Sequence, residues 1–502
     1  MSQLRLLICR VDEGDNQVTE RARVTLPPVL ADAGAAPLDT LEAQVATVGQ
    51  CLLGRLCELP WDALDAQAVA RYRAGQAPGS VVADGSDTLF VASRFGTLQL
   101  RRQVCAHHDG RPHIMPGNDL LPMHQGILIT RGLQEQGCLL PQDLPFATAA
   151  CLLGWQSGEP GLLSTTTLRT LVRAHGARIR CLEQGEAQRI TTYGTRGQRL
   201  RVVPEERPRR HAGWPSALSA AVEAALADGQ RRPPGGVSQG DWDRVRTART
   251  EDATATVAAL RRLGPEVAPG QMLLVLDEVL APTPGRGNFH ELRTACLLTS
   301  EGRRYLSGTG APFLHQAKAA VQACCARSLL VVADGASWIR TFFRDHLAAF
   351  PQAEMLLDWS HLAQKCRDVG ARICPDRARR RPFLRRLLRA LWAGAVPRAV
   401  RVLEAQRPQA ADASAVDTVR TYLEARSEWI PAYRTRRRQR RYIGSGLGEK
   451  ANDRIVVRRQ KRRGMQWREQ TSDALAALRT LQLNEGWDAY WHDRRFLHLT
   501  AA

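Results

Sequence analysis

Long apolar runs are missing from this sequence. No stretch of ~18 consecutive apolar residues is present, which is the length that a membrane-spanning helix needs. The first residues also lack the basic start and short apolar core of a secretory signal. We therefore expect a cytoplasmic protein with no membrane partner.

Lysine is scarce, although the chain is strongly basic. Only 4 of the 70 basic residues are lysine, and the formal net charge is +20 at pH 7. A codon bias toward arginine explains most of this ratio, so the ratio says little about function. The excess of positive charge, in contrast, predicts an acidic polymer as the binding partner.

Cysteines with the spacing of a disulfide framework or a zinc ribbon are also missing. The 12 cysteines follow no extracellular pattern, which favours reduced thiols in a cytoplasm. The stretch 104–113 offers Cys105, His107 and His108, but the chain has no C-x-x-C, and a structural zinc site needs four ligands. We predict an ordinary turn here rather than structural zinc, and leave open whether these three residues bind a metal.

Two short apolar runs each end on an aspartate. Leu273–Leu276 precedes Asp277, and Leu329–Ala333 precedes Asp334. Short apolar runs closed by a turn signal are typical of strands buried on both faces. Between the two runs the pattern predicts two strands and then a helix, over residues 291–298, 304–306 and 311–326. The predicted order is strand, strand, strand, helix, strand, with a carboxylate ending the first and the last.

Two carboxylates on adjacent strands repel each other. At an effective dielectric of ~20 and a separation of ~4 Å the repulsion is on the order of 4 kcal/mol, so such a pair shares a proton or binds a cation. Mg²⁺ suits this site because it takes oxygen ligands from carboxylates, waters and substrate phosphates. Two such ions can clamp the attacking and leaving oxygens of an in-line phosphoryl displacement. A third carboxylate is then needed, and the glycine-rich turn 442–448 leads to the best candidate, Glu449.

Four segments are similar to one known family. DGASWI (334–339), DWSHL (358–362), IGSGLGE (443–449) and VVRRQKRRGMQW (456–467) together resemble bacterial insertion-sequence transposases of the DDE class. They are most similar to the Kra-type group, which is related to the Mutator-like transposases. The resemblance implies a ribonuclease-H-like catalytic domain, a transposition activity on DNA, and an association with the nucleoid.

The resemblance also implies roles for single residues. Asp277, Asp334 and Glu449 are the expected acidic triad, holding two Mg²⁺ ions, with Mn²⁺ as an alternative. Asp358 and His361 correspond to the family's D-x-x-H motif and are expected to lie next to the metal site. A single aspartate after a strand is also a common turn residue, so Glu278 and Asp358 remain alternative ligands. In addition, Asp277 is followed by Glu278 where relatives usually have glycine.

The interval between Asp334 and Glu449 far exceeds the ~2–6 residues of an ordinary βα connection. Apolar spacing there predicts helices over residues 339–350, 359–373, 382–393, 396–406 and 416–433. We therefore expect an α/β fold: a ribonuclease-H-like mixed-sheet catalytic domain interrupted by an all-helical insertion, with an α-rich N-terminal DNA-binding region. The resemblance implies that the insertion helps to shape the DNA ends.

A chain of 502 residues is too long for one ordinary core. The predicted parts are an N-terminal region (1–117), a helix-turn-helix-like region with a connector (118–203), a Pro/Gly/Arg-rich linker (204–253), the first part of the catalytic core (254–339), the helical insertion (340–441) and the last part of the core with a basic C-terminal segment (442–502). Further predicted elements are strands over 4–10, 22–26, 178–182 and 199–203, helices over 41–59 and 254–263, and a less regular stretch over 60–117.

Two segments are candidates for DNA contact. A short helix over 145–155, a Gly-Glu-Pro-Gly turn and a helix opened by Ser164 form a possible helix-turn-helix, equally well explained as a packed helical pair. Its expected base-facing residues are Thr165, Thr166, Arg169 and Arg173. The second candidate is 434–463, where basic residues greatly outnumber acids around Glu449, so a phosphate-tracking surface is preferred over a merely solvated face. Its expected contacts are Arg436, Arg437, Arg438, Arg440, Arg441, Arg458, Arg459, Lys461, Arg462 and Arg463.

The sequence therefore predicts a DDE transposase that acts on double-stranded DNA as a homodimer or larger homo-oligomer. Two alternatives remain open at this point. One is a structure-specific nuclease with the same metal site, and the other is a catalytically inactive, transposase-derived DNA-binding protein.

Overall fold

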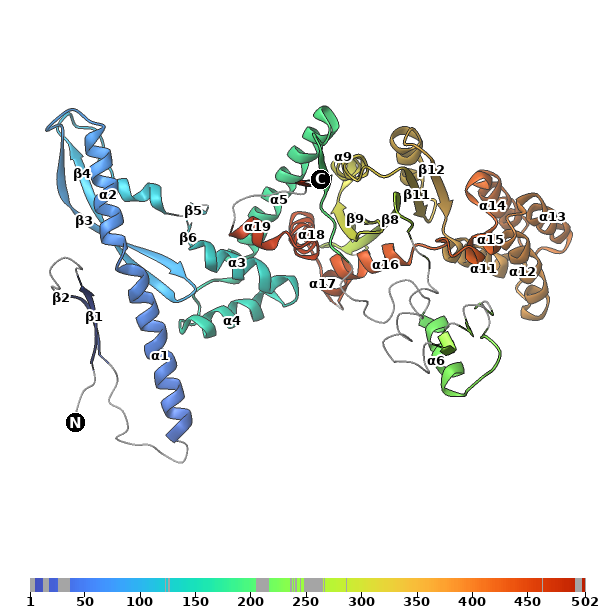
Figure 1. Ribbon diagram of the computed structural model, residues 1–502, viewed down its shortest axis with the longest axis horizontal. Helices are drawn as coiled ribbons and strands as arrows, with labels where there is room; N and C mark the ends of the chain where they lie inside the picture. The colour runs from blue at the N-terminus through green and yellow to red at the C-terminus, as the bar shows by residue number, and fades with distance from the viewer. Residues whose placement is uncertain are drawn as a thin grey trace. The chain divides into compact units, whose positions relative to one another are not determined.

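The chain forms two compact units, Met1–Gly176 and Ala177–Ala502 (Figure 1). The computed structural model describes residues 5–11, 18–25, 37–121, 123–124, 127–204, 216–234, 237, 239, 242–243, 245–247, 265, 267–285, 287–462, 464–492 and 499–501. The predicted helix over 254–263, parts of the predicted linker and the predicted contact Arg463 lie outside these residues. None of the described helices has the length and apolar character that crossing a membrane requires.

The first unit begins with two hairpins and two helices. Strands β1 (Arg5–Val11) and β2 (Val18–Thr25) overlap the two predicted strands and form an antiparallel pair. Helix α1 (Pro37–Glu58) covers all but the last residue of the helix predicted over 41–59. Residues 60–117 are more regular than expected, because helix α2 (Trp61–Ala74) is followed by a long antiparallel hairpin. Its strands are β3 (Val81–Ser93) and β4 (Gly96–His107). Alternate residues of β4 are buried, and Leu98 and Leu100 pack with Trp61 and Val91.

Three helices follow, α3 (Arg131–Leu139), α4 (Phe146–Ser157) and α5 (Thr165–Tyr193). Helix α4 ends at Gly158, whose left-handed conformation (φ 71°) suits a residue without a Cβ. The strand predicted over 178–182 is wrong, because these residues continue α5. Buried residues recur here at helical spacing, at Ile179, Glu183, Ala187 and Ile190. The five residues 178–182 are too few to show this helical period.

The second unit contains a mixed five-stranded sheet with the order β10-β9-β8-β11-β12. The strands are β8 (Gln271–Pro282), β9 (Phe289–Leu298), β10 (Arg303–Gly308), β11 (Ser328–Ala333) and β12 (Ala353–Leu357). Strands β8 to β10 are antiparallel neighbours, whereas β11 and β12 run parallel to β8. Helix α9 (Gly310–Ala323) connects β10 to β11, so the predicted strand and helix order is confirmed. This α/β arrangement is compatible with a ribonuclease-H-like fold.

Strand β12 corrects the expectation of an all-helical interval after Asp334. It lies inside the predicted insertion and extends the sheet by pairing with β11. Its five residues, AEMLL, are too few to show a period, and Glu354 interrupts their apolar character.

The two faces of the sheet pack against different helices. Met272, Leu274 and Leu276 of β8 share a cluster with residues of α9 and of α10 (Ser337–Phe342). The alternate residues Leu273 and Val275 share another cluster with helices that follow the sheet, because successive strand residues point to opposite faces. These helices are α11 (Trp359–Ile373), α12 (Arg377–Trp392), α13 (Val396–Gln406) and α14 (Ala413–Glu424).

The predicted helix over 416–433 is interrupted. Helix α14 ends at Glu424, a short 3₁₀ turn follows at Ser427–Trp429, and α15 (Tyr433–Arg438) begins after Pro431. Proline has no backbone N–H and disfavours helical geometry in the residue before it, which explains the break.

The last part of the chain returns to the sheet. Helix α16 (Gly446–Asn452) contacts β8 and β9, and α18 (Glu469–Leu483) packs against β10. At the outer edge of β10, the Asn484 side chain accepts a hydrogen bond from the Tyr305 backbone N–H and donates one to the Tyr305 carbonyl, each at 2.8 Å. This amide therefore takes the place of another strand at that point.

The predicted linker is partly structured. Helix α6 (Ser216–Ala227) lies within it, and Val222 and Ala225 are buried together with Trp242 and Val245. The predicted strand over 199–203 corresponds to the shorter β7 (Gln198–Leu200).

Candidate active site

Asp277 and Asp334 lie at the same level of two adjacent parallel strands. Strands β8 and β11 pair in register through Val275 and Val332. Two further residues along that register, Asp277 lies beside Asp334, which directly follows β11. The two aspartates that the sequence pattern singled out are therefore neighbours across the sheet.

Burial and nearby charges shift the pKa of the Asp277 carboxyl. Burial raises the pKa of Asp277, and the charges of Asp334 and Glu449 add to it, so that the pKa is about 6. The Glu278 backbone N–H, which donates to Asp277 Oδ1 at 2.8 Å, acts in the opposite direction, as does His361. Carboxylates that repel one another in this way fit a divalent cation, which would offset the repulsion.

A glycine lets α16 approach the sheet closely enough to bring Glu449 there. A Cβ on Gly448 would lie 2.9 Å from Val275 Cγ1 and 3.3 Å from Asp277 Cβ, so a larger residue would push α16 away from β8. On the same helix, Asn452 Nδ2 donates to Asp277 Oδ2 at 2.7 Å. Asn452 is in turn oriented by Thr294, whose hydroxyl donates to Asn452 Oδ1 at 2.5 Å.

Asp358 forms a second group next to the first. It follows β12 directly and caps α11, with Oδ1 accepting from the Ser360 backbone N–H at 2.8 Å. Its Oδ2 lies 2.5 Å from His361 Nδ1 and accepts from the Ser445 hydroxyl at 2.5 Å. Gly444 also packs against this carboxylate, since a Cβ there would lie 3.3 Å from Asp358 Oδ1. The glycine-rich turn that carries Glu449 is thus bound to the start of α11.

The hydrogen bonds of this group shift two pKa values in opposite directions. Burial alone would raise the pKa of Asp358, but the hydrogen bonds from His361, Ser445 and Ser360 outweigh it and hold the pKa below its ordinary value. The bond with Asp358, together with the charges of Asp358, Asp277 and Asp334, raises the pKa of His361 to about 9 although burial opposes the shift. His361 is therefore an imidazolium at neutral pH, close to the catalytic aspartates predicted from the sequence.

Asp358, His361 and Glu449 could hold a metal ion. One ligand atom of each side chain lies within 4.8 Å of those of the other two. An ion at these three side chains would have to displace the proton of His361, because only neutral imidazole ligates a metal. Glu449 is common to this set and to the predicted triad, so the structure brings all five predicted site residues into one neighbourhood.

The Glu278 side chain forms its contacts on the opposite face of the sheet. Its Oε2 accepts a hydrogen bond from Trp338 Nε1 at 2.6 Å, and the guanidinium of Arg293 lies 4.4 Å from the centre of the Trp338 ring. Because Asp277 and Glu278 are consecutive in a strand, their side chains point to opposite faces. This geometry favours Asp277 over Glu278 as the carboxylate that faces Glu449.

Residues of α14 hold the loop after β11. Arg426, just beyond the end of α14, donates from Nη2 to the Gly335 carbonyl at 3.1 Å, and the Tyr422 hydroxyl donates to the Asp334 carbonyl at 3.4 Å. Gly335 has a φ of 82° and leaves no room for a Cβ, which would lie 2.7 Å from Leu357 Cδ1. Arg426, Tyr422 and Asn452 were not predicted as site residues, because no local pattern relates them to the acidic residues. Ser445 lies in the segment IGSGLGE that leads to Glu449, but its contact with Asp358 was not predicted.

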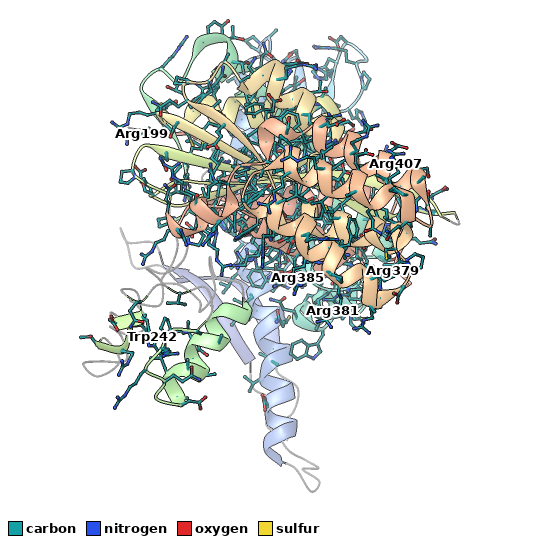
Figure 2. All side chains as sticks on the ribbon, turned by 90° about the vertical axis from the view of Figure 1, so that its right-hand side faces the viewer. Arg199, Trp242, Arg379, Arg381, Arg385 and Arg407 are labelled. Atoms are coloured by element: carbon teal, nitrogen blue, oxygen red, sulfur yellow. The ribbon has the colours of Figure 1, made fainter. Side chains whose placement is uncertain are left out.

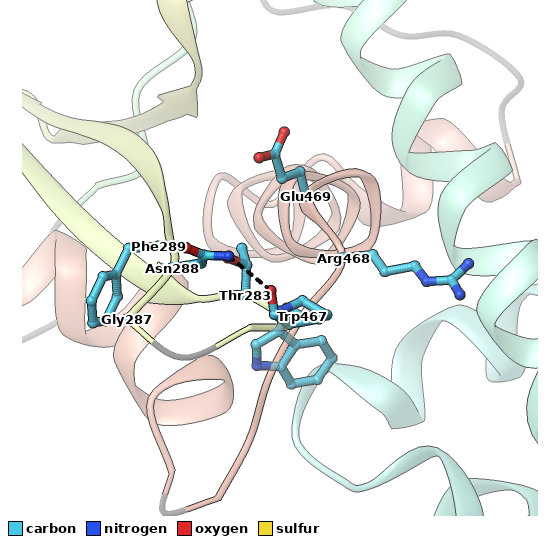
Figure 3. Close-up of a pocket in the computed structure, with 8 residues that line it drawn as sticks. Thr283, Gly287, Asn288, Phe289, Trp467, Arg468 and Glu469 are labelled. Atoms are coloured by element: carbon cyan, nitrogen blue, oxygen red, sulfur yellow. Dashed lines mark hydrogen bonds between the residues drawn. The ribbon is translucent and has the colours of Figure 1, made fainter.

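An open hollow of about 690 Å³ lies at the tip of the β8–β9 hairpin (Figure 3). Thr283, Asn288 and Phe289 line one side, and Trp467, Arg468 and Glu469 line the other. Thr283 is six residues beyond Asp277, about 20 Å along an extended strand. The hollow is therefore separate from the carboxylates.

The predicted helix-turn-helix segment contains two exposed candidates. Ser164 caps α5 as predicted, since its hydroxyl accepts from the Thr167 backbone N–H at 3.0 Å. Thr166 and Arg169 are exposed, and Thr165 and Arg173 are half-buried. The guanidinium of Arg169 lies 5.5 Å from the centre of the Phe146 ring of α4.

The predicted phosphate-binding segment divides into buried and exposed residues. Arg436 is buried in an ion pair with Glu354 of β12, and Arg459 is buried over the ring of Trp467. Both guanidinium groups therefore form contacts within the protein rather than facing solvent. The exposed members are Arg437, Arg438, Arg441, Arg458, Lys461 and Arg462, and Arg440 is half-buried.

Cys105 and His107 lie on β4, and His108 follows it. Cys105 is fully buried and its backbone pairs with Ile114, while His107 Nε2 lies 2.9 Å from the Tyr72 hydroxyl. Among the described residues, the group of three possible metal ligands contains none of the three residues Cys105, His107 and His108.

A scan against protein-family models gave no match for this chain, and a search of curated proteins gave no significant match either.

Proposed function

We propose that this protein is a DDE transposase that cuts double-stranded DNA at the ends of an insertion sequence and joins them to target DNA. The observation that carries the proposal is the register of β8 and β11, which places Asp277 beside Asp334. Glu449 is near enough for its charge to contribute to the raised pKa of Asp277. The resemblance to the Kra-type group and the sheet order add support. We also propose that the mixed five-stranded sheet belongs to a ribonuclease-H-like fold.

In this proposal Asp277, Asp334 and Glu449 hold two Mg²⁺ ions, with Mn²⁺ as an alternative. When bound, these ions supply charge neutralisation at the phosphate and activation of the attacking oxygen. In the first step, water oxygen bonds to phosphorus, the bond to the DNA 3′-oxygen breaks, and that oxygen leaves as a 3′-hydroxyl. In the second, the 3′-oxygen of the element end bonds to the phosphorus of a target phosphodiester and loses its proton. The bond from that phosphorus to the target 3′-oxygen breaks, and this oxygen takes up a proton and leaves as a 3′-hydroxyl.

The surrounding side chains orient the carboxylates. Asn452 fixes one oxygen of Asp277, and the Glu278 backbone N–H fixes the other. Asp358 holds the proton of His361 at Nδ1, so that a positive charge faces the carboxylates and the incoming phosphate. Positioning and electrostatic stabilisation of this kind account for most of the catalysis in phosphoryl transfer.

The test is a strand-transfer assay with purified protein, labelled element-end DNA, a target plasmid and Mg²⁺. Asp334→Asn should bind the ends and neither cut nor join them. Glu278→Gln, which removes the neighbouring carboxylate on the other face of β8, should retain both activities. Cutting by Asp334→Asn at the wild-type rate would reject the assignment. Cutting of branched DNA without joining would favour a structure-specific nuclease instead.

A further inference from the structure

Helix α12 has an exposed face made of arginine. Its sequence, RARRRPFLRRLLRALW, contains no acidic residue. Arg377, Arg381, Arg385 and Arg389 recur every four residues and are all exposed, and Figure 2 shows Arg381 and Arg385 on this helix. The opposite side is apolar and buried, through Phe383, Leu387, Ala390 and Leu391.

Three arginines elsewhere in the same group of helices are paired with acids, whereas Arg367 of α11 and Arg398 and Arg401 of α13 are exposed and, among the described residues, form no ion pair. Arg372 of α11 binds Asp412 at 2.7 Å, and Arg407 and Arg420 bind the carboxylates of Glu404 and Asp417. Among the residues that the structure describes, in contrast, the four arginines that recur along α12 form no ion pair. The scarcity of lysine in this chain accounts for the choice of arginine over lysine, but it does not account for the lack of neighbouring carboxylates.

This arrangement is costly for an isolated helix. Like charges four residues apart destabilise a helix by about 0.2–0.5 kcal/mol per pair, and the row contains three such pairs in succession. Asp376, which caps α12 by accepting from the Ala378 and Arg379 backbone N–H groups, lies at the N-terminal end of the helix. A row with unneutralised charge along its length suits an anionic ligand that supplies the missing negative charge.

We infer that the arginine row of α12 is a binding surface for the phosphate backbone of double-stranded DNA. The row from Arg377 to Arg389 spans ~18 Å at 1.5 Å per residue. One DNA strand presents a phosphate about every 3.4 Å along its axis, so about five phosphates face that length. The planar guanidinium group also matches phosphate oxygens in a bidentate geometry.

Packing connects this surface to the sheet. Phe383, Leu387 and Leu391 of α12 belong to the same buried cluster as Val275 of β8 and Val332 of β11. Val275 is two residues from Asp277, so the arginine row and the carboxylates belong to one packed body. DNA held on α12 is therefore held by the part of the protein that contains the proposed catalytic centre. The C-terminal end of α12 also meets the basic segment around Glu449, because the guanidinium of Arg437 lies 6.0 Å from the centre of the Trp392 ring.

The inference rests on the proposed action on DNA, and salt-dependent binding tests the two separately. The probe is a fluorescein-labelled 30-base-pair duplex, titrated between 50 and 300 mM NaCl in EDTA so that no cleavage occurs. The test protein carries Arg381→Gln, Arg385→Gln and Arg389→Gln. The matched control carries Arg372→Gln, Arg407→Gln and Arg420→Gln, which removes the same number of charges from carboxylate-paired arginines.

The plot of log K against log salt should become less steep by about 2.7 in the test protein, because each lost phosphate contact contributes about 0.9 to the slope. The control should keep the wild-type slope. Glutamine preserves helix propensity and removes like-charge pairs, so thermal unfolding should show both proteins folded. Equal slopes in test and control would overturn this inference alone. A wild-type protein that does not bind the duplex would overturn the proposed function as well.

Discussion

Asp277 is the residue whose carboxyl group is most affected by the other charges of the site. It is held on one oxygen by Asn452 and on the other by a backbone N–H, and it lies beside two further acids. Its pKa of about 6 lies above the ordinary value for aspartate, about 3.9. A proton therefore binds the folded protein more tightly than the unfolded chain at this position.

The sign of the resulting pH effect can be predicted for the metal-free protein. Because the folded pKa is raised, the stabilising contribution is complete below pH ~4 and is lost as the pH rises through about 6. We expect the Tm in EDTA to fall between pH 5 and pH 7, and Mg²⁺ to restore it at pH 7. Asp277→Asn should remove both effects. A Tm of the wild type that stays constant from pH 5 to pH 7 would contradict the coupling.

Asn452 offers a test of orientation without loss of a carboxylate. Asn452→Leu removes the hydrogen bond to Asp277 and should lower cleavage or metal affinity by about 10- to 100-fold, as is typical for residues that orient metal ligands. Thr294→Val removes only the donor to Asn452 and should have a smaller effect. A Mg²⁺ titration of the cleavage rate measures both. Cleavage by Asn452→Leu that matches the wild type at every Mg²⁺ concentration would exclude this role.

At the scale of elements, the site depends on how closely α16 approaches β8. Gly448 allows this approach, and the turn before it is bound to α11 through Ser445 and Asp358. Strand β12 ends at Leu357, directly before Asp358, so a strand and two helices are fixed together by one carboxylate.

Two glycines of α16 make a matched pair of substitutions. Gly448→Ala places a Cβ 2.9 Å from Val275 Cγ1 and should displace Glu449, with lower Tm and strongly reduced cleavage. Gly446→Ala meets nothing within 4 Å and should be neutral or stabilise the helix by about 0.5–1 kcal/mol. Differential scanning calorimetry and the cleavage assay distinguish the two. Equal effects of both substitutions would show that close approach is not the determinant.

The sequence predicted the elements that have a clear period or a clear end. The runs before Asp277 and Asp334, the helix after β10 and several helices of the inserted interval are present as expected. Strand β12 was missed because five residues show no period, and residues 178–182 were misassigned because their window was too short. Asn452 and Arg426 could not be predicted, since their contacts with Asp277 and Gly335 are between segments far apart in the chain.

At the scale of the whole molecule, the proposal requires two copies. Both ends of an element must be joined in one event, and symmetric homo-oligomers are the usual solution. The net charge of +20 also means that copies repel one another until an acidic ligand is bound. We therefore expect assembly to depend on DNA.

Mixed subunits can test this expectation. In an equal mixture of wild type and Asp334→Asn, products joined at both ends should fall to about one quarter if each active site in a dimer processes one end. Single-end cleavage should fall only to about one half. Light scattering with and without end DNA measures the assembly directly. Two-ended products that decrease in simple proportion to the wild-type fraction would contradict a two-subunit requirement.

The Asn484 side chain at the edge of the sheet has a consequence for solubility. Exposed edge strands are templates for aggregation, because their free N–H and C=O groups can pair with another chain. At β10 the Tyr305 groups are already paired with an amide. Asn484→Leu would free them, so the cost of losing this one side chain should appear less in catalysis than in the yield of protein that stays monodisperse during expression.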